Sequence, residues 1–260
     1  MPTSSGKSIV TKEQITAGLR EIGLPGGAIV MVHSSLSSFG YVEGGAPAVV
    51  EALLNCVGPK GTVMVPTQPF RGSEYVYMKA RPTFDVRSTP SLVGAITEAV
   101  RHHPRALRSL HPSHPVAAIG PLAVPLLRDH EKAATSCGLG TPFFRNIVEG
   151  GYILLLGVDN RRNTTLHTIE EVYDGDVLSE ETFDAVIVDY EGRTRRGWCR
   201  PHAPNRPRNF PRVETDLLAA GAMNVGRIGD AEVRLIDARR LLEIVSARLR
   251  EDPRYLLASN

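Results

Sequence analysis

The sequence predicts an α/β domain in which a mixed sheet is flanked by helices. Continuous apolar runs alternate with helix-like segments in the first quarter of the chain, as in sheets covered on both faces. Near the end, apolar runs flank a Glu-Gly turn, which is typical of an antiparallel hairpin. The chain has 260 residues with 42% apolar content and shows neither a linker nor a repeat. We therefore expect one domain spanning residues 1–260.

The first quarter of the chain is expected to form helix, strand, helix and strand. Thr11 and Gln14 have capping-box spacing, so the first helix is expected to begin there. The second helix carries Pro47 near its first turn, where a missing N–H costs nothing. Both strands are continuously apolar, as buried parallel strands are. These four elements are expected at residues 11–23, 28–35, 46–54 and 62–66.

The pattern is lost between Pro66 and Ser91, where the residues are polar, aromatic-rich and irregular. A loop of that length is usually functional or mobile. Later helices are expected at about 91–100, 121–130, 141–149 and 214–223, and strands at 116–120, 152–158 and 225–236. A hairpin is expected at 183–200, and a closing helix is capped by Asp237 and ends before Pro253. The sheet should be parallel at first and antiparallel toward the end.

Composition excludes several classes of protein. The net charge of +2 does not favour a nucleic-acid partner, and no apolar run approaches the roughly 18 residues of a membrane helix. The three cysteines lack C-x-x-C spacing, which argues against a disulfide framework or a zinc ribbon. The first ten residues lack the apolar centre of a signal peptide. We expect a cytoplasmic protein with no metal.

Three short segments carry candidate chemistry. VHSSLSSFG (32–40) leaves a buried strand, and its N–H groups suit an anion such as a diphosphate, unless the serines only cap a helix. RSLHPSHP (108–115) contains two histidines, but prolines after both prevent a shared helical face, which argues against zinc. Cys137 has no local base and is expected to be a small buried thiol.

NTTLHTIEEVY (163–173) follows the buried strand at 152–158 directly. If Asn163 or Thr164 caps a helix, His167 and Glu170 lie on one face, three residues apart. A carboxylate on an imidazole fixes its tautomer and makes it a better base. The competing interpretation is an exposed His–Glu pair of little consequence. The position beyond the end of a core strand favours a site, because open α/β sheets bind ligands there.

Taken together, these motifs resemble the aminoglycoside 3-N-acetyltransferase family, whose antibiotic N-acetyltransferase fold is distinct from the GNAT fold. The matching segments are VHSSLSSFG, GPKGTVMVP, RSLHPSHPVAAIG, GLGTPFFRNI, GGYILLLGV and NTTLHTIEEVY. The resemblance implies direct acetyl transfer from acetyl-CoA to a primary amine. It places the catalytic pair on His167 and Glu170, with Thr165 near the thioester. It implies cofactor contacts at Ser34, Ser35, Thr67, Arg108, Ser109 and Thr141.

The acceptor is less clear from the sequence. Residues 174–184 carry five acids, which suit a polycationic aminoglycoside acetylated at its 3-amino group, whereas residues 191–212 carry seven arginines. Candidate acceptor contacts are Glu74, Asp85, Asp174, Arg200 and His202. A second hypothesis is the same transfer to a small, even anionic, amine such as a biosynthetic intermediate. A catalytically idle CoA-binding protein and a non-specific RNA-binding protein are third and fourth hypotheses. A homodimer is also considered.

Overall fold

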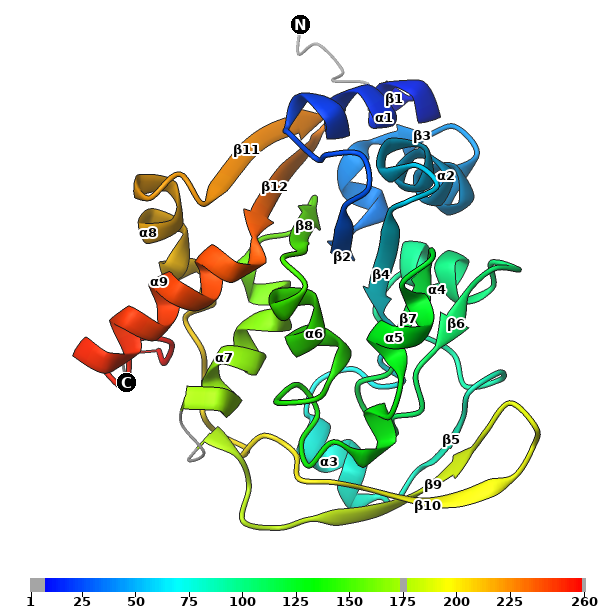
Figure 1. Cartoon of the computed structure of the whole chain (residues 1–260), viewed down its shortest axis with the longest axis vertical. Coiled ribbons are helices and arrows are strands. Elements are labelled where there is room, and N and C mark those ends of the chain that lie inside the picture. The colour runs from blue at the N-terminus through cyan, green and yellow to red at the C-terminus, as the bar shows by residue number, and fades with distance from the viewer. Residues whose placement is uncertain (1–7, 174–176, 259–260) are drawn as a thin grey trace, which may run out of the picture.

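The computed structural model describes residues 8–173 and 177–258, and its centre is a seven-stranded sheet (Figure 1). The strand order is β11-β12-β8-β2-β4-β7-β6. The strands are β2 (Ile29–Ser34), β4 (Thr62–Pro66), β6 (Leu107–Arg108), β7 (Val116–Ile119), β8 (Tyr152–Leu156), β11 (Met223–Ile228) and β12 (Ala231–Asp237). The three central strands, β8, β2 and β4, are parallel, and every other neighbouring pair is antiparallel.

Helices cover both faces of this sheet. They are α1 (Lys12–Glu21), α2 (Gly45–Val57), α4 (Ala95–Arg101), α5 (Ala123–Leu127), α6 (Pro142–Val148), α7 (Thr165–Tyr173), α8 (Val213–Ala219) and α9 (Ala238–Glu251). Successive β2 side chains point to opposite faces, as the pleat requires. Val30 and Val32 pack with α1, α2 and α4, whereas Ile29 and Met31 pack with α5 and α6. A third apolar cluster joins β8 and β12 to α7, α8 and α9.

The predicted mixed sheet flanked by helices is confirmed, but its strand directions differ from the expectation. Antiparallel strands occur on both sides of the parallel centre. After β4 the chain crosses through α4 to β6 at the sheet edge and doubles back as β7 between β6 and β4. This reversal makes β7 antiparallel to β4, and no local pattern in the apolar run of β7 encodes it.

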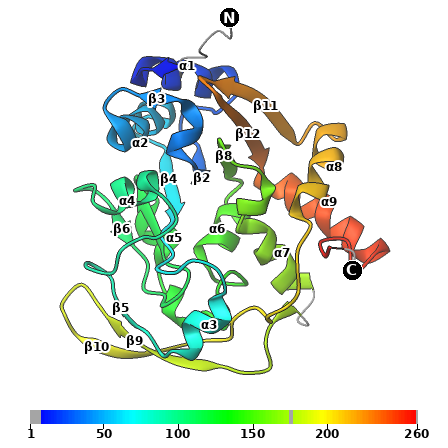
Figure 2. The same ribbon diagram turned by 180° about the vertical axis from the view of Figure 1, so that it is seen from behind.

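The segment predicted as an irregular loop contains a short helix and a short strand. These are α3 (Glu74–Lys79), capped by Ser73, and β5 (Thr83–Asp85). The predicted hairpin is present as β9 (Phe183–Val188) and β10 (Thr194–Cys199). It lies outside the main sheet, because β5 pairs with β9 to make a separate three-stranded sheet. Figure 2 shows α3 beside this second sheet, below the carboxyl ends of the central strands.

Small elements complete the described chain. β1 (Ile9–Val10) pairs with β3 (Tyr41–Val42), and 3₁₀ turns are η1 (Leu36–Phe39), η2 (His130–Lys132), η3 (Asn160–Arg162) and η5 (Phe210–Arg212). The capping predictions at both ends are confirmed: Thr11 and Gln14 form a capping box, and Asp237 accepts from the Arg240 N–H. None of the helices within residues 8–173 and 177–258 is long and apolar enough to span a membrane.

Candidate active site

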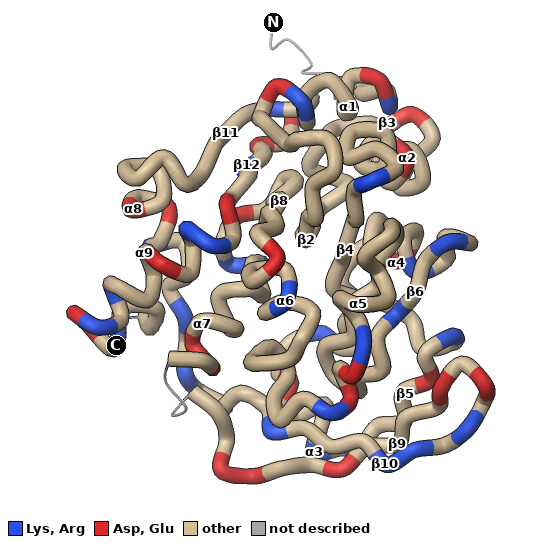
Figure 3. The backbone as a smooth tube through the Cα atoms, in the orientation of Figure 1, with Lys and Arg blue, Asp and Glu red and all other residues tan. Residues whose placement is uncertain are grey.

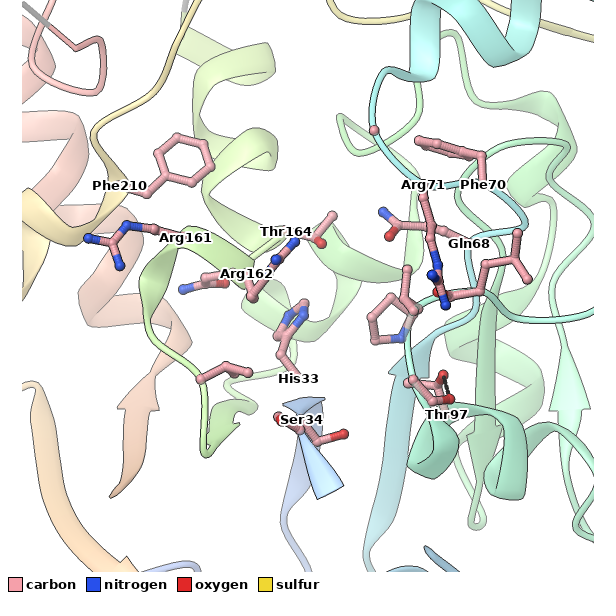
Figure 4. Close-up of a pocket in the computed structure, with 18 of the residues that line it drawn as sticks. His33, Ser34, Gln68, Phe70, Arg71, Thr97, Arg161, Arg162, Thr164 and Phe210 are labelled. Carbon is pink, nitrogen blue, oxygen red and sulfur yellow. Dashed lines mark hydrogen bonds between the residues drawn. The ribbon is translucent and has the colours of Figure 1, made fainter. Parts of the chain in front are cut away.

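A large cavity opens at the carboxyl ends of the parallel strands. Its volume is about 1880 Å³, and its lining includes His33 and Ser34 from the end of β2 and His167 from α7. Figure 4 shows Arg161 and Phe210 on one side and Gln68, Phe70 and Arg71 on the other, with Arg162, Thr164, His33 and Ser34 between them. This is the edge at which open α/β sheets bind ligands, because loops diverge there on either side of a central strand.

Helix α7 presents the predicted pair to this cavity. The Asn163 side chain accepts from the Thr165 N–H at 3.2 Å, so it caps the first turn as expected. One turn on, His167 Nδ1 lies 2.8 Å from Glu170 Oε2. Glu170 is nearly fully buried, whereas the His167 side chain is 26% exposed at the cavity wall. Since a carboxylate only accepts, Nδ1 carries the proton and Nε2 is the basic nitrogen.

Arg208 completes this group from a segment far along the chain. Its Nε donates to Glu170 Oε1 at 3.0 Å, and its side chain is only 13% exposed. Burial by itself would raise the pKa of Glu170, but His167 and Arg208 together hold that pKa below its usual value. Glu170 is therefore an ionised, immobile partner for the imidazole.

A second histidine packs on the first. The rings of His202 and His167 have centroids 4.3 Å apart, and the Phe210 ring meets His167 edge-on at 4.8 Å. His202 Nδ1 lies 3.2 Å from Glu74 Oε2, and its Nε2 lies 3.1 Å from Glu171 Oε1. Burial disfavours the charged ring, but Glu171 and Glu74 raise the pKa of His202 to about 10.

Glu74, expected to meet the acceptor from an exposed loop, is instead buried at the start of α3. His114 Nδ1 lies 3.1 Å from Glu74 Oε1, and the Ser113 hydroxyl donates to the same oxygen at 2.6 Å. The Ser136 hydroxyl also donates to this oxygen. Burial would raise the pKa of Glu74, but His114 and His202 hold it well below its usual value. Its charge is thus balanced by neighbouring side chains.

Four predicted cofactor contacts lie behind the cavity rather than on its wall. Arg108 donates from Nε to the Thr67 hydroxyl at 2.9 Å and from Nη2 to the Thr67 carbonyl at 2.7 Å. The Ser109 hydroxyl forms a hydrogen bond with His130 Nδ1, and the Thr141 hydroxyl caps the first turn of α6. None of these four side chains lines the cavity, because all are turned into hydrogen bonds that hold the strand ends and helix α6. These bonds lie behind the site, and contacts of the four residues with the cofactor stay predictions.

Ser34 and Ser35 do line the cavity. The Ser34 hydroxyl is buried and has no hydrogen-bond partner among the described residues. The Thr165 hydroxyl is also buried without a hydrogen-bond partner among the described residues, and its neighbour Thr164 lines the cavity. Unsatisfied buried donors beside a cavity are the groups a ligand would complete, since an unpaired polar atom is costly.

The remaining acceptor candidates are dispersed. Asp85 accepts from the N–H groups of Arg87 and Ser88, and Arg200 donates to the Ser179 carbonyl at 2.6 Å. Neither lines the cavity, so a direct acceptor contact from either is not supported. Asp174 lies outside the described residues. His202 lies on the wall, where its ring packs at a tilt against that of His167.

The arginine-rich stretch divides into two parts. Arg193 and Arg195 pair with Asp189, and Arg196 pairs with Asp184, all on the β9–β10 hairpin, where blue and red segments alternate in Figure 3. Arg206 and Arg208 lie on the cavity wall instead. Ion pairs within the hairpin therefore account for the first part, so these three hairpin arginines do not form a patch of free cations for RNA.

Several wall residues were not predicted from the sequence. His33 stands next to Ser34, and its Nε2 is buried without a partner among the described residues. Burial lowers the pKa of His33 to about 3, so the ring is neutral. Arg161 and Arg162 directly precede the predicted NTTLHTIEEVY stretch, and this adjacency is the signal that would have found them. Cys137 and Cys199 are fully buried, and burial raises the pKa of each thiol well above its usual value.

Comparison with known proteins decides the family. The model of aminoglycoside 3-N-acetyltransferases matches residues 31–250. The chain belongs to this family. Aminoglycoside N(3)-acetyltransferase III of Acinetobacter baumannii is 38% identical, with 89% of this chain and 88% of the relative covered. Aminoglycoside N(3)-acetyltransferase VII of Streptomyces paromomycinus is 30% identical, with 93% and 92% covered.

Solved structures of the family share the fold. AAC-IIIb in binary complex with CoASH superposes with a TM-score of 0.81 at 25% identity, over 94% of this chain and 97% of that one. AAC-VIa bound to sisomicin gives a TM-score of 0.81 at 29% identity, over 94% of this chain and 98% of that one. As a member of the aminoglycoside 3-N-acetyltransferase family, the chain is an acetyltransferase whose acetyl donor is acetyl-CoA.

Proposed function

We propose that the protein transfers the acetyl group of acetyl-CoA to a primary amine, with His167 as the general base. The observation that carries this proposal is the His167–Glu170–Arg208 arrangement at the edge of the cavity. Glu170 fixes the tautomer, so the basic Nε2 is left for the incoming amine. Burial and the neighbouring His202 lower the pKa of His167, and these effects outweigh Glu170. A lowered pKa keeps the base neutral near pH 7.

The chemical step follows from this geometry. An alkylamine is mostly protonated at pH 7, and only the neutral form attacks. Its nitrogen adds to the thioester carbonyl carbon, and His167 Nε2 takes the proton that the nitrogen loses. The tetrahedral intermediate then collapses, the C–S bond breaks, and His167 returns the proton to the departing sulfur. The products are the amide and free CoA, and no acyl-enzyme is needed, in keeping with the buried, protonated Cys137.

The cavity fits acetyl-CoA as the donor. The wall carries five arginines, which suit the phosphates of CoA. They are Arg71, Arg161, Arg162, Arg206 and Arg208. The Ser34 hydroxyl and His33 Nε2, which have no hydrogen-bond partner among the described residues, supply further hydrogen-bonding groups at the end of β2. Ser34, Ser35 and Thr165 remain our proposed contacts to the donor.

The catalytic proposal is tested by replacing the base and its partner. His167→Ala should lower kcat by about 10²–10⁴-fold, which is the usual contribution of a general base, with CoA affinity nearly unchanged. Glu170→Gln should also lower kcat, because the charge beside His167 is lost. Its effect should be smaller than that of His167→Ala, because the side chain keeps its shape and the base remains. Thiol release from acetyl-CoA measures turnover, and calorimetric titration with CoA measures affinity. Wild-type turnover in His167→Ala would show that the base lies elsewhere.

We propose an aminoglycoside, acetylated at its 3-amino group, as the first candidate acceptor. It rests on the names of the relatives and on the sisomicin complex of AAC-VIa. A second candidate is a small amine that also bears a carboxylate or phosphate. It is favoured by charge: among the described wall residues the one carboxylate is Glu74, which already pairs with His114 and His202. A polycation gains little from such a wall.

One panel separates the two acceptors. The purified enzyme is given acetyl-CoA with aminoglycosides, with amino acids and amino sugar phosphates, and with His167→Ala as the blank. Acetylation of aminoglycosides, with no turnover of the anionic amines, supports the first candidate. Turnover confined to anionic amines supports the second, and a higher KM for those amines in Arg206→Glu with unchanged CoA affinity would assign this arginine to the acceptor rather than to the donor.

A further inference from the structure

His202 occupies a position between two carboxylates and the base. Its ring contacts His167 at a centroid distance of 4.3 Å with the planes 44° apart. Its backbone N–H and its Nδ1 both lie 3.2 Å from Glu74 Oε2. Its Nε2 lies within ion-pair distance of Glu171 Oε1, at 3.1 Å, although neither of these two atoms forms a hydrogen bond of regular geometry among the described residues. Only 11% of the side chain is exposed.

We propose that His202 is a positioning residue: a fixed imidazolium that packs against His167 and holds the base in its neutral form. This inference rests on the proposed role of His167. It differs from a direct role in binding the acceptor, because His202 acts through its neighbour. The donor and acceptor need not touch His202 for the effect to operate.

The carboxylates around the His167 and His202 rings have different partners. Glu170 and Glu171 are adjacent on α7, yet Glu170 faces His167 and Arg208, whereas Glu171 faces His202 and the Thr135 hydroxyl. Glu74 comes from α3 and faces His202 and His114. The basic groups that pair with these three acids are His114, His167, His202 and Arg208. His202 therefore stands between the base and two further carboxylates.

The charge on His202 has a direct consequence for His167. A carboxylate beside an imidazole favours the imidazolium, which cannot accept a proton. Three buried carboxylates within one small cluster would all favour that inactive form. A cation whose ring packs against His167 opposes them. The pKa of His167 is lowered by burial and next by His202, whereas Glu170 raises it.

The test compares pH–rate profiles of kcat/KM for wild type, His202→Gln and His202→Lys. His202→Gln keeps a hydrogen-bonding side chain without charge, so the acid-side midpoint should rise by roughly one pH unit or more. His202→Lys keeps a cation between the two carboxylates, so its midpoint should stay near that of wild type. His102→Gln is the matched control, since His102 is 66% exposed and off the cavity wall. Its profile should coincide with wild type.

Two outcomes would overturn the inference. One is a His202→Gln enzyme that is slower but has an unshifted midpoint, as a purely structural role predicts. The other is an equal shift in His202→Gln and His202→Lys, which would make the ring rather than its charge responsible.

A second measurement needs no variant and no acceptor. In ¹⁵N-histidine-labelled wild type at pH 8.5, one ring should remain protonated on both nitrogens and show a nuclear Overhauser contact to a neutral ring. A spectrum without such a pair overturns the inference even where His202→Gln fails to fold. If wild type transfers no acetyl group, the proposed function fails, but this spectrum still tests His202.

Discussion

Individual side chains around the cavity are held in fixed charge states by their neighbours. His202 is kept charged by Glu171 and Glu74, and Glu74 is kept ionised by His114 and His202. Such shifts make stability depend on pH. A raised histidine pKa contributes stability that is complete below its unfolded value of about 6.5 and is lost as pH rises through about 10. A depressed carboxyl pKa contributes stability above about 4.5 that is lost as pH falls.

The free energy of unfolding should reveal this coupling. His202→Gln should be less stable than wild type by a margin that is widest near pH 6 and closes toward pH 10, where the wild-type ring itself loses its proton. Urea denaturation at unit pH intervals from 6 to 10 measures the margin. His102→Gln, which replaces an exposed histidine, should track wild type throughout. Parallel wild-type and His202→Gln curves would contradict a raised His202 pKa.

At the same scale, the sequence predicts contacts only within one helix. The His167–Glu170 contact follows from a spacing of three residues on α7, and it is present. His202 and Arg208 reach the same cluster from 35 or more residues further on, along a segment with no regular periodicity. Their approach depends on how the second sheet and α3 place that segment, which no spacing in the sequence encodes.

At the scale of elements, periodicity predicts the long helices and the continuous apolar strands. It misses α3 and β5, with six and three residues, which are too short to show a period. Their positions are fixed by tertiary burial of Met78 and Phe84, both fully inaccessible. Strand direction cannot be predicted from periodicity either. The direction of β7 depends on which edge of the sheet the chain reaches after β4, where it forms β6 and then reverses.

Close strand packing makes Gly120 a sensitive position. It follows β7 with φ of 144°, and a Cβ there would lie 2.4 Å from the Gly61 carbonyl oxygen and 2.5 Å from Thr62 Oγ1. Gly120→Ala should therefore destabilise the fold by roughly 2–5 kcal/mol, from a backbone region open only to glycine and from the overlap at the start of β4. Thermal or urea unfolding measures the loss.

Gly192 provides the control. It lies in the β9–β10 turn with φ of 77°, and a Cβ there would meet no atom within 4 Å. Gly192→Ala should cost only the left-handed backbone term, about 1–2 kcal/mol. Equal losses in the two alanine proteins would show that the overlap beside β4 relaxes freely.

At the scale of the molecule, the cavity joins parts that are far apart in the chain. Its wall combines the ends of β2, β4 and β8 with α4, α7 and the segment from His202 to Phe210. A ligand that binds there therefore stabilises the folded chain as a whole. At one hundred times its dissociation constant, CoA should add about 2.7 kcal/mol. For a chain of this size that corresponds to a rise in Tm of roughly 5–10 °C.

Thermal shift with CoA, dephospho-CoA and pantetheine measures this effect. The rise should be largest for CoA and smallest for pantetheine, and it should shrink with salt, because the wall arginines act on phosphates. The double variant R161A/R162A should lose part of the CoA effect. Arg196→Ala, which breaks only a hairpin pair with Asp184, should keep all of it. An identical rise with pantetheine would show that the arginines do not hold the phosphates.

His167 and Glu170, the proposed base and its partner, both lie on α7, whereas much of the opposite wall comes from irregular segments outside the main sheet. Substitution and insertion are tolerated in such segments far more readily than in a packed helix. Changes in these segments can therefore alter the wall that faces an acceptor amine while His167 and Glu170 keep their positions. The architecture thus separates a packed helix, which tolerates little change, from a facing wall in which new side chains can be tried at low cost to the fold.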